Sequence, residues 1–159
     1  MTAPLLTRVA RLPFASGFEP AQLRRLCATG RSAAYRPGER IFTEGGAADR
    51  FWLIENGRVA LDLRVPGRGD QVIETLATGA VLGWSWLHPP YRWQFGCETR
   101  GPVDTVMFDA AAVRELCDAD PAFGYAMLRR FVPVITGRLH ATRLRLLDLY
   151  AAPAAKARP

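Results

Sequence analysis

The sequence YRPGERIFTEGGAADRFWLIENGRVALDL, residues 35–63, decides the fold. Apolar residues alternate with polar ones along it, and the alternation stops at glycine-bearing breaks at 36–39, 44–49 and 55–57. This pattern is typical of half-buried antiparallel strands. Asn56-Gly57 is expected to form a hairpin turn, because both residues tolerate positive φ. The stretch therefore predicts the short strands of a ligand-holding β-roll and not a phosphate-loop or dinucleotide-binding fold.

The same pattern extends on both sides of this stretch. Short helices are expected over 3–12 and 19–29, and residues 66–70 are expected to form a hairpin loop. Strands are expected near 32–36, 40–44, 51–55, 58–64, 71–76, 81–82, 93–100 and 104–109. About eight short strands at this spacing predict a mainly β domain, an eight-stranded jelly roll or barrel over about 32–109.

After Asp109 the pattern becomes helical. Residues 110–117 predict a short helix with Asp109 as its N-cap, and Asp120-Pro121 predicts the start of a long helix. Pro133 should kink the long helix or mark its effective start. The C-terminal helices are thus expected over about 110–150, followed by a flexible tail over 151–159.

The long helix carries apolar residues at alternating spacings of four and three. This coiled-coil spacing either forms a homodimer seam or packs the helix on its own barrel, and its length of three heptads favours the homodimer. The seam residues are Leu128, Val132, Ile135, Leu139, Thr142, Leu146 and Leu149.

Composition limits the class of protein. At 159 residues with 49% hydrophobic residues, the chain fits about one globular domain. No apolar run is long enough to span a membrane, and Arg8 and Arg11 interrupt the N-terminal apolar run where a signal peptide would be uncharged. We therefore expect a cytoplasmic protein. The three cysteines are scattered and lack the close pairing of a metal site; they are Cys27, Cys97 and Cys117. We therefore expect no bound metal, and we expect the cysteines to be free buried thiols.

The net charge of +6 is concentrated at the C-terminal end. Residues 129–159 hold six arginines and Lys156 against the single acid Asp148, whereas residues 1–128 are balanced. Such a segment could contact nucleic acid or an acidic partner. The alternative is compositional bias, because the chain has 20 arginines and one lysine.

Three segments resemble the cyclic nucleotide-binding domain family, the sensor half of Crp/Fnr-type regulators. They read YRPGERIFTEGGAADRFWLIENGRVAL, TLATGAVLGWSWL and DADPAFGYAMLRR, and the similarity covers about 13–150. The resemblance implies a cupin-like roll, a nucleotide pocket inside it and dimerisation through the long helix. The chain departs from the family pattern in two ways. After Tyr150 too few residues remain for a helix-turn-helix domain, and the phosphate-binding cassette is altered.

The altered cassette defines the candidate site. By resemblance, Trp84 stands where the family has a glutamate that holds the ribose, and Arg92 is the nearest match to the phosphate-binding arginine. Trp93, Gln94 and Phe95 replace the family's small residues. The candidate ligand-binding residues are Gly83, Trp84, Ser85, Trp86, Tyr91, Arg92 and Trp93.

The residue types at this site suit a phosphate beside a flat ring. Backbone amides after Gly83, the Ser85 hydroxyl and the Arg92 guanidinium could hold the phosphate. The four rings of Trp84, Trp86, Tyr91 and Trp93 could form an aromatic wall that stacks on a ligand or holds Arg92 by a cation–π contact. Alternatively, the rings fill the pocket and the domain takes no ligand.

Catalytic interpretations are weak. Residues 83–87 begin like a nucleophile elbow, but Leu87 replaces the required second glycine. His88 as a haem ligand has no further support in the sequence. We therefore expect a non-catalytic regulatory protein that binds a cyclic or other nucleotide and signals to a protein partner through a homodimer helix. The alternatives are a ligandless accessory subunit of a larger redox enzyme, such as an NAD-reducing hydrogenase, and a DNA-associated regulator.

Overall fold

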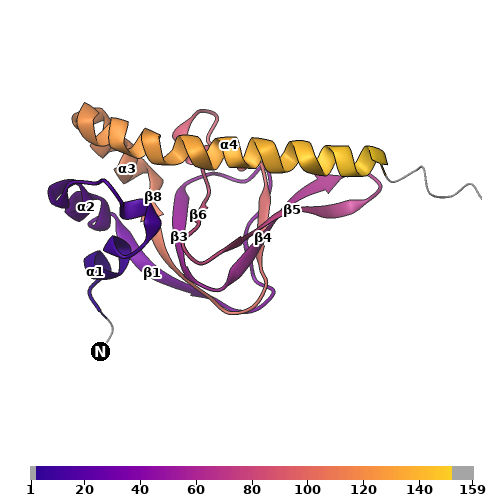
Figure 1. Cartoon of the computed structure of the whole chain (residues 1–159), viewed down its shortest axis with the longest axis horizontal. Helices are drawn as coiled ribbons and strands as arrows, with labels where there is room; N and C mark the ends of the chain where they lie inside the picture. Colours follow the sequence, from indigo (N-terminus) through magenta and orange to yellow (C-terminus); the bar gives the residue numbers. More distant parts are fainter. Residues whose placement is uncertain (1–2, 152–159) are drawn as a thin grey trace, which may run out of the picture.

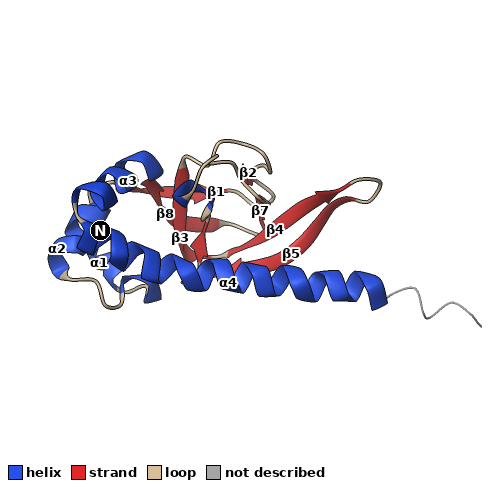
Figure 2. Cartoon of the chain, turned by 90° about the horizontal axis from the view of Figure 1, so that it is seen from above, coloured by secondary structure: helices blue, strands red, loops and turns tan. Residues whose placement is uncertain are grey.

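The computed structural model describes residues 3–151 and shows two antiparallel sheets of four strands each, wrapped into a roll. The strand orders are β1-β8-β3-β6 and β2-β7-β4-β5. Helices gather at one end of the roll, and the long helix α4 crosses its top and continues beside the β4–β5 hairpin (Figures 1 and 2). The predicted mainly β roll with a long C-terminal helix is confirmed.

The elements follow the predicted order closely. The strands are β1 (Gly30–Tyr35), β2 (Arg40–Phe42), β3 (Arg50–Asn56), β4 (Arg58–Val65), β5 (Gly69–Ala77), β6 (Val81–Leu82), β7 (Gly96–Thr99) and β8 (Val103–Asp109). The helices are α1 (Leu5–Ala10), α2 (Pro20–Cys27), α3 (Ala110–Ala119) and α4 (Pro121–Ala151), with 3-10 turns η1 (Pro13–Ala15) and η2 (Ser85–Leu87). The hairpin predicted at residues 66–70 is present, because β4 and β5 pair directly on either side of it.

The hairpin predicted at Asn56-Gly57 is wrong. β3 pairs with β6 and β8, whereas β4 pairs with β5 and β7, so the chain crosses from one sheet to the other at Gly57. Gly57 has the positive φ that the sequence predicted, at +98°, and a Cβ there would collide with the carbonyl oxygen of Pro102. The glycine is required by this close crossing and not by a two-residue turn.

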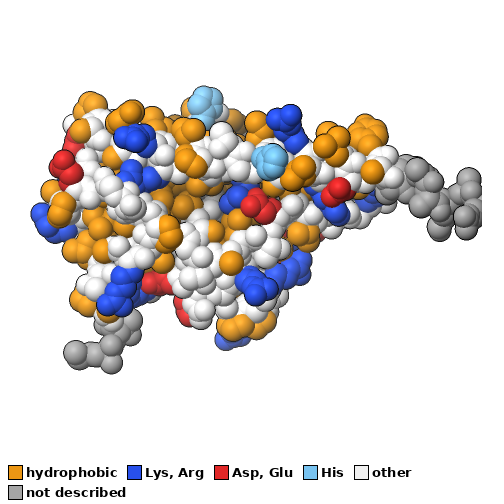
Figure 3. Space-filling view, in the orientation of Figure 1, with side chains coloured by type: hydrophobic (Ala, Val, Ile, Leu, Met, Phe, Trp, Pro, Cys, Tyr) orange, Lys and Arg blue, Asp and Glu red, His pale blue; other side chains and the backbone are white. Residues whose placement is uncertain are grey.

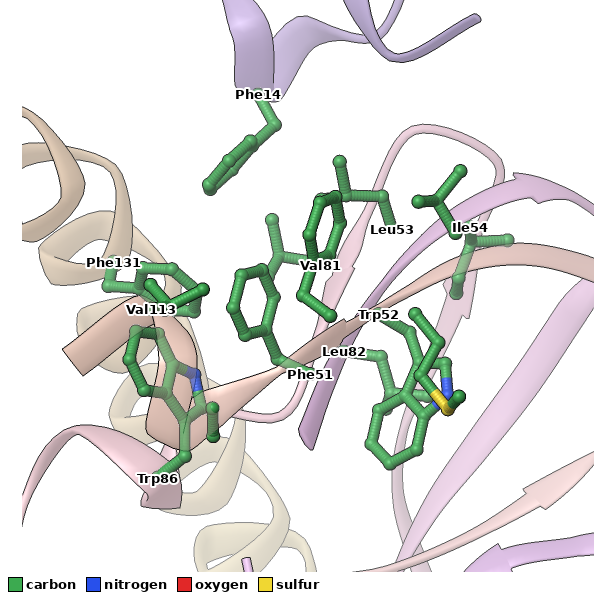
Figure 4. Close-up of a cluster of buried hydrophobic side chains, with 14 of the residues drawn as sticks. Phe14, Phe51, Trp52, Leu53, Ile54, Val81, Leu82, Trp86, Val113 and Phe131 are labelled. Carbon is green, nitrogen blue, oxygen red and sulfur yellow. The ribbon is translucent and has the colours of Figure 1, made fainter. Parts of the chain in front are cut away.

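The alternation in the sequence predicted that β3 would be half-buried, and this prediction is wrong. Its four central residues, Phe51 to Ile54, are all buried. Phe51 packs against Phe131 of α4, with ring centroids 5.3 Å apart, while Trp52 stacks on Phe42 of β2 at 5.5 Å. The strand therefore separates two apolar layers, one beneath the helices and one inside the roll (Figure 4).

The long helix runs without interruption through Pro133, so the proline does not mark its start. Its first half buries Phe123, Met127 and Phe131 against the helical end of the roll. Of the flexible tail predicted at 151–159, all but Ala151 lies outside the described residues.

No helix within residues 3–151 combines the length and the apolar character that crossing a membrane requires.

Asp120 ties the start of α4 to α2. One carboxylate oxygen accepts hydrogen bonds from the backbone N–H groups of Ala122 and Phe123, and the other accepts one from Arg25 at 2.7 Å. The bond from Arg25, followed by the backbone bond from Phe123, lowers the pKa of Asp120 below its ordinary value. A carboxylate with a lowered pKa stabilises the fold above its unfolded-state pKa, and this contribution is lost as the pH falls through the folded-state pKa.

Replacing Asp120 with alanine is therefore expected to lower the melting temperature at neutral pH by an amount that does not change down to about pH 5. Below about pH 4 the difference between Asp120→Ala and the wild type should shrink, because the wild-type carboxylate becomes protonated. Melting curves between pH 3 and 8 measure this. Asp118→Ala, two residues earlier on an exposed carboxylate, is the control and should show no such trend. A difference that grows on acidification would contradict the assignment.

Candidate functional site

The predicted site residues lie on the loop between β6 and β7, here called the 83–95 loop. β6 pairs with β3 as the edge strand of its sheet, so the loop leaves the sheet at that edge. Gly83 has a φ of +90°, and a Cβ there would lie 3.0 Å from the Trp93 ring. Glycine is needed at this position because the backbone both adopts positive φ and lies directly against an indole.

The roll encloses a small cavity beneath this loop. Its walls come from β2 and β4 of one sheet, from the 83–95 loop and from α4, and they are Phe42, Leu61, Gly83, Trp84, Ser85, Trp93, Phe95 and Arg138. Its volume is about 10 Å³. That is the space of about one water molecule, whereas small-molecule sites usually have about 300–1,000 Å³.

Trp93 occupies the interior of the roll. Only 5% of its surface is exposed, and its ring stacks on Phe42 with centroids 4.1 Å apart and planes 19° apart. Trp52 lies beside both rings, 5.8 Å from Trp93 and 5.5 Å from Phe42, and its indole N–H donates to the Tyr35 hydroxyl at 2.8 Å. Offset stacking at these distances is a favourable arrangement for aromatic rings. The interior is thus packed with aromatic side chains.

Trp84 and Ser85 also reach the cavity. Ser85 is buried, and its hydroxyl oxygen lies 3.4 Å from the backbone N–H of Gln94. The Trp84 indole N–H is buried and finds no acceptor among residues 3–151. Most buried donors are hydrogen-bonded, so an unpaired indole N–H costs stability.

Trp86 points to the opposite side, into the core beneath the helices. Its ring is fully buried, stacks on Phe51 at 4.8 Å and meets Phe131 of α4 edge-on at 5.2 Å (Figure 4). The short turn η2 therefore places Trp84 and Ser85 at the cavity and Trp86 against the long helix.

Tyr91 and Arg92 do not line the cavity. The Tyr91 ring lies 4.2 Å from the guanidinium carbon of Arg114 on α3, and Arg114 also donates to the Trp86 carbonyl at 2.9 Å. The cation–π partner of the loop is thus Arg114, where the sequence pointed to Arg92. Arg92 is exposed, and its backbone bridges to Ala47. The predicted aromatic wall is divided, with Trp84 and Trp93 at the cavity and Trp86 and Tyr91 outside it.

Arg138 is the cavity residue that sequence reasoning missed. It comes from α4, only 8% of it is exposed, and it donates to Glu74 of β5 at 2.7 Å and to the Val81 carbonyl at 3.3 Å. Burial lowers the pKa of Arg138, whereas the neighbouring Glu74 carboxylate acts to raise it. Arginine nevertheless remains charged in proteins. A signal existed, because Arg138 continues the i, i+4, i+7, i+11 series of Met127, Phe131 and Val134 on the core-facing side of the helix.

The cysteines take no part in the cavity lining. Cys27 and Cys97 are buried and Cys117 is half-buried, all as free thiols. Burial raises the pKa of each, most strongly at Cys97 in β7. They are therefore protonated and unreactive near neutral pH.

The family model of the cyclic nucleotide-binding domain matches residues 33–120, more than half of the chain. The chain belongs to the cyclic nucleotide-binding domain family. The matched segment covers the roll, the 83–95 loop and α3, and it ends just before α4.

Known relatives agree with this assignment and place the chain among the Crp/Fnr-type domains. The CRP-like cAMP-activated global transcriptional regulator of Mycobacterium tuberculosis is 25% identical over 141 residues, which are 89% of this chain and 61% of the relative. The chain therefore spans about three fifths of that relative's length.

Two solved structures share the fold. A cyclic nucleotide-binding protein from Geobacter metallireducens GS-15 is 25% identical with a TM-score of 0.75, and the match covers 88% of this chain and all of that one. A cyclic nucleotide-binding domain from Methylobacillus flagellatus kt is 24% identical, also with a TM-score of 0.75, over 91% of this chain and 81% of that one.

Proposed function

We propose that the chain is a non-catalytic regulatory module that self-associates through α4 and relays the state of the roll to a protein partner. The regulatory role is supported by the domain family and by the regulator it resembles. The single observation that carries the self-association is the exposed apolar seam of α4.

The seam is a line of apolar side chains that the roll leaves uncovered. Leu128, Val132, Leu139 and Leu146 each expose between 51% and 58% of their surface. Ile135, Thr142 and Leu149 fill the positions between them and are half-buried. In the space-filling view, hydrophobic side chains lie along α4 between its arginines (Figure 3). An extended apolar line on one helix is a usual marker of a protein–protein interface.

Two arginines of the basic C-terminal segment are engaged within the chain, which leaves fewer of its charges for a role in DNA binding. Arg130 donates to the carbonyl oxygens of Phe14 and Ser16 and lies over the Phe18 ring at 3.8 Å. Arg138 is buried against Glu74. These two arginines hold α4 on the roll, so they are unavailable to an anionic surface.

Placing aspartates at Val132 and Leu139 is expected to convert a dimer into a monomer and so to halve the mass measured by sedimentation equilibrium. Two charges in the centre of the seam would be desolvated in a dimer without a partner, which is strongly unfavourable. Both side chains are exposed in the single chain, so the double variant should keep its fold and its circular dichroism spectrum.

Leu144→Asp is the matched control, because Leu144 is as exposed as the seam residues but lies about 140° around the helix from Leu139. This variant should keep the mass of the wild type. A wild-type chain that sediments as a monomer, or an equal effect of Leu144→Asp, would exclude the seam.

A second candidate function is a ligand-free accessory subunit, including the expected role in a larger redox enzyme. The cavity of about 10 Å³ favours it, because no nucleotide fits without rearrangement. A sensor would gain thermal stability from its nucleotide by mass action, and an accessory subunit of this kind would not.

A further inference from the structure

We infer that Trp93 is the permanent occupant of the roll cavity and that the Arg138–Glu74 pair closes it, so that α4 stays docked without a nucleotide. This inference goes beyond the proposed function, because any state that the roll relays would then not be the binding of a nucleotide in this cavity. It concerns what fills the roll and is therefore tested separately from self-association.

The interior of the roll has no room for a nucleotide. Trp93, Phe42 and Trp52 form one packed aromatic group, and the cavity left beside them holds about 10 Å³. A purine nucleotide would have to displace a whole indole ring. The ring's stacking with Phe42 at 4.1 Å already supplies the kind of contact that a bound base would make.

The backbone of Trp93 is held in place by hydrogen bonds to the turn after β2. Its N–H donates to the Gly46 carbonyl at 2.9 Å, and its carbonyl accepts from the Gly45 N–H at 2.8 Å. Tyr91, two residues earlier, accepts from the Ala48 N–H at 2.8 Å. This part of the 83–95 loop is thus bonded to the turn after β2, so the loop backbone does not swing outward and carry the ring out of the cavity while these bonds last.

The charge in the cavity wall is already compensated. A nucleotide phosphate needs a guanidinium or exposed amides, and the cavity offers Arg138. Each of its terminal nitrogens already makes one hydrogen bond, one to Glu74 and one to the Val81 carbonyl, and the Glu74 carboxylate compensates its charge. Arg92, the cation that the family resemblance suggested, is exposed outside the lining. An entering phosphate would therefore compete with the Glu74 carboxylate for the guanidinium that ties α4 to β5 and β6.

The test compares thermal shifts of the wild type and of Trp93→Ala in the presence of indole, cyclic AMP and cyclic GMP. The wild type is expected to show no shift with any of the three. Trp93→Ala is expected to melt lower and to regain about 5 °C or more at saturating indole, because indole binds only the folded state and refills the vacated space.

Two controls make the result specific. Tyr91→Ala removes a ring from the same loop but outside the cavity, so indole should not affect it. Trp93→Phe keeps an aromatic ring in the cavity and should bind indole at least tenfold more weakly than Trp93→Ala. If Trp93→Ala does not fold alone, it is refolded at saturating indole, which binds only the folded state and should restore the native circular dichroism spectrum.

A wild-type shift with cyclic AMP or cyclic GMP would overturn the inference, because Trp93 would then be displaceable. Folded Trp93→Ala that ignores indole would overturn it as well. Neither result depends on the mass of the assembly. Conversely, a monomeric wild type that shows no nucleotide shift would refute self-association through the seam, but it would agree with the inference that Trp93 fills the roll.

Discussion

Replacing Trp86 with alanine is expected to lower the free energy of unfolding by about 3–5 kcal/mol, the cost typical of removing a fully buried large aromatic side chain. Trp86 lies where the 83–95 loop, β3 and α4 meet, between Phe51 and Phe131. Its loss would leave a cavity that the stacked rings around it cannot close, since Phe51 is itself held against Phe108 at 4.8 Å. Urea denaturation followed by circular dichroism measures the change.

Trp86→Phe is the informative control. The Trp86 indole N–H is buried and has no acceptor within the described chain, so phenylalanine removes an unpaired donor while it keeps a ring in place. We expect a loss below about 1.5 kcal/mol for this variant. Equal losses for Trp86→Ala and Trp86→Phe would mean that the N–H has a partner and that ring packing is not the main contribution.

Replacing Glu74 with alanine is the second large effect, with an expected loss of about 2–4 kcal/mol. Removing one partner of a buried ion pair leaves the other charge uncompensated, and that costs about 3–5 kcal/mol at full burial. Glu74 is 29% exposed and water reaches the pair from its side, so the expected loss is somewhat smaller. Arg138 would remain buried in the cavity wall, and among residues 3–151 its one remaining acceptor would be the Val81 carbonyl.

The order of single and double variants tests this explanation. Arg138→Met removes the buried charge and leaves Glu74 near solvent, so it should cost less than Glu74→Ala. The double variant Arg138→Met with Glu74→Leu should lie close to the wild type, since apolar replacements of buried pairs are often neutral. The exposed pair Arg64–Asp70 is the control, and Arg64→Ala should change stability by less than about 1 kcal/mol. A double variant as unstable as Glu74→Ala would contradict the argument.

Local signals predicted most of the fold. Apolar runs bounded by turn residues located all eight strands of the described chain, and Asp120-Pro121 located the start of α4. These features depend on neighbours in the sequence, which is why they can be read from it. The Asn56-Gly57 turn could not be assigned correctly, because positive φ at Gly57 fixes the local bend but not which strands pair on either side of it.

The site was predictable as a segment and less so residue by residue. Gly83, Trp84, Ser85 and Trp93 line the cavity, whereas Trp86, Tyr91 and Arg92 face elsewhere. An irregular loop has no period, so neighbouring side chains such as Arg92 and Trp93 take unrelated directions. Arg138 comes from a helix more than forty residues later in the chain, and only the docking of α4 brings it to the cavity.

The unbroken course of α4 through Pro133 gives the molecule a lever. The helix has 31 residues, so it is about 46 Å long. Its last fastening in the roll interior is Arg138, from which the arm to Tyr150 measures about 18 Å. A tilt of about 5° at that fulcrum would move the far end by about 1.5 Å, enough to separate two apolar surfaces from contact. Small repacking around one arginine would thereby be amplified at the end of the helix farthest from it.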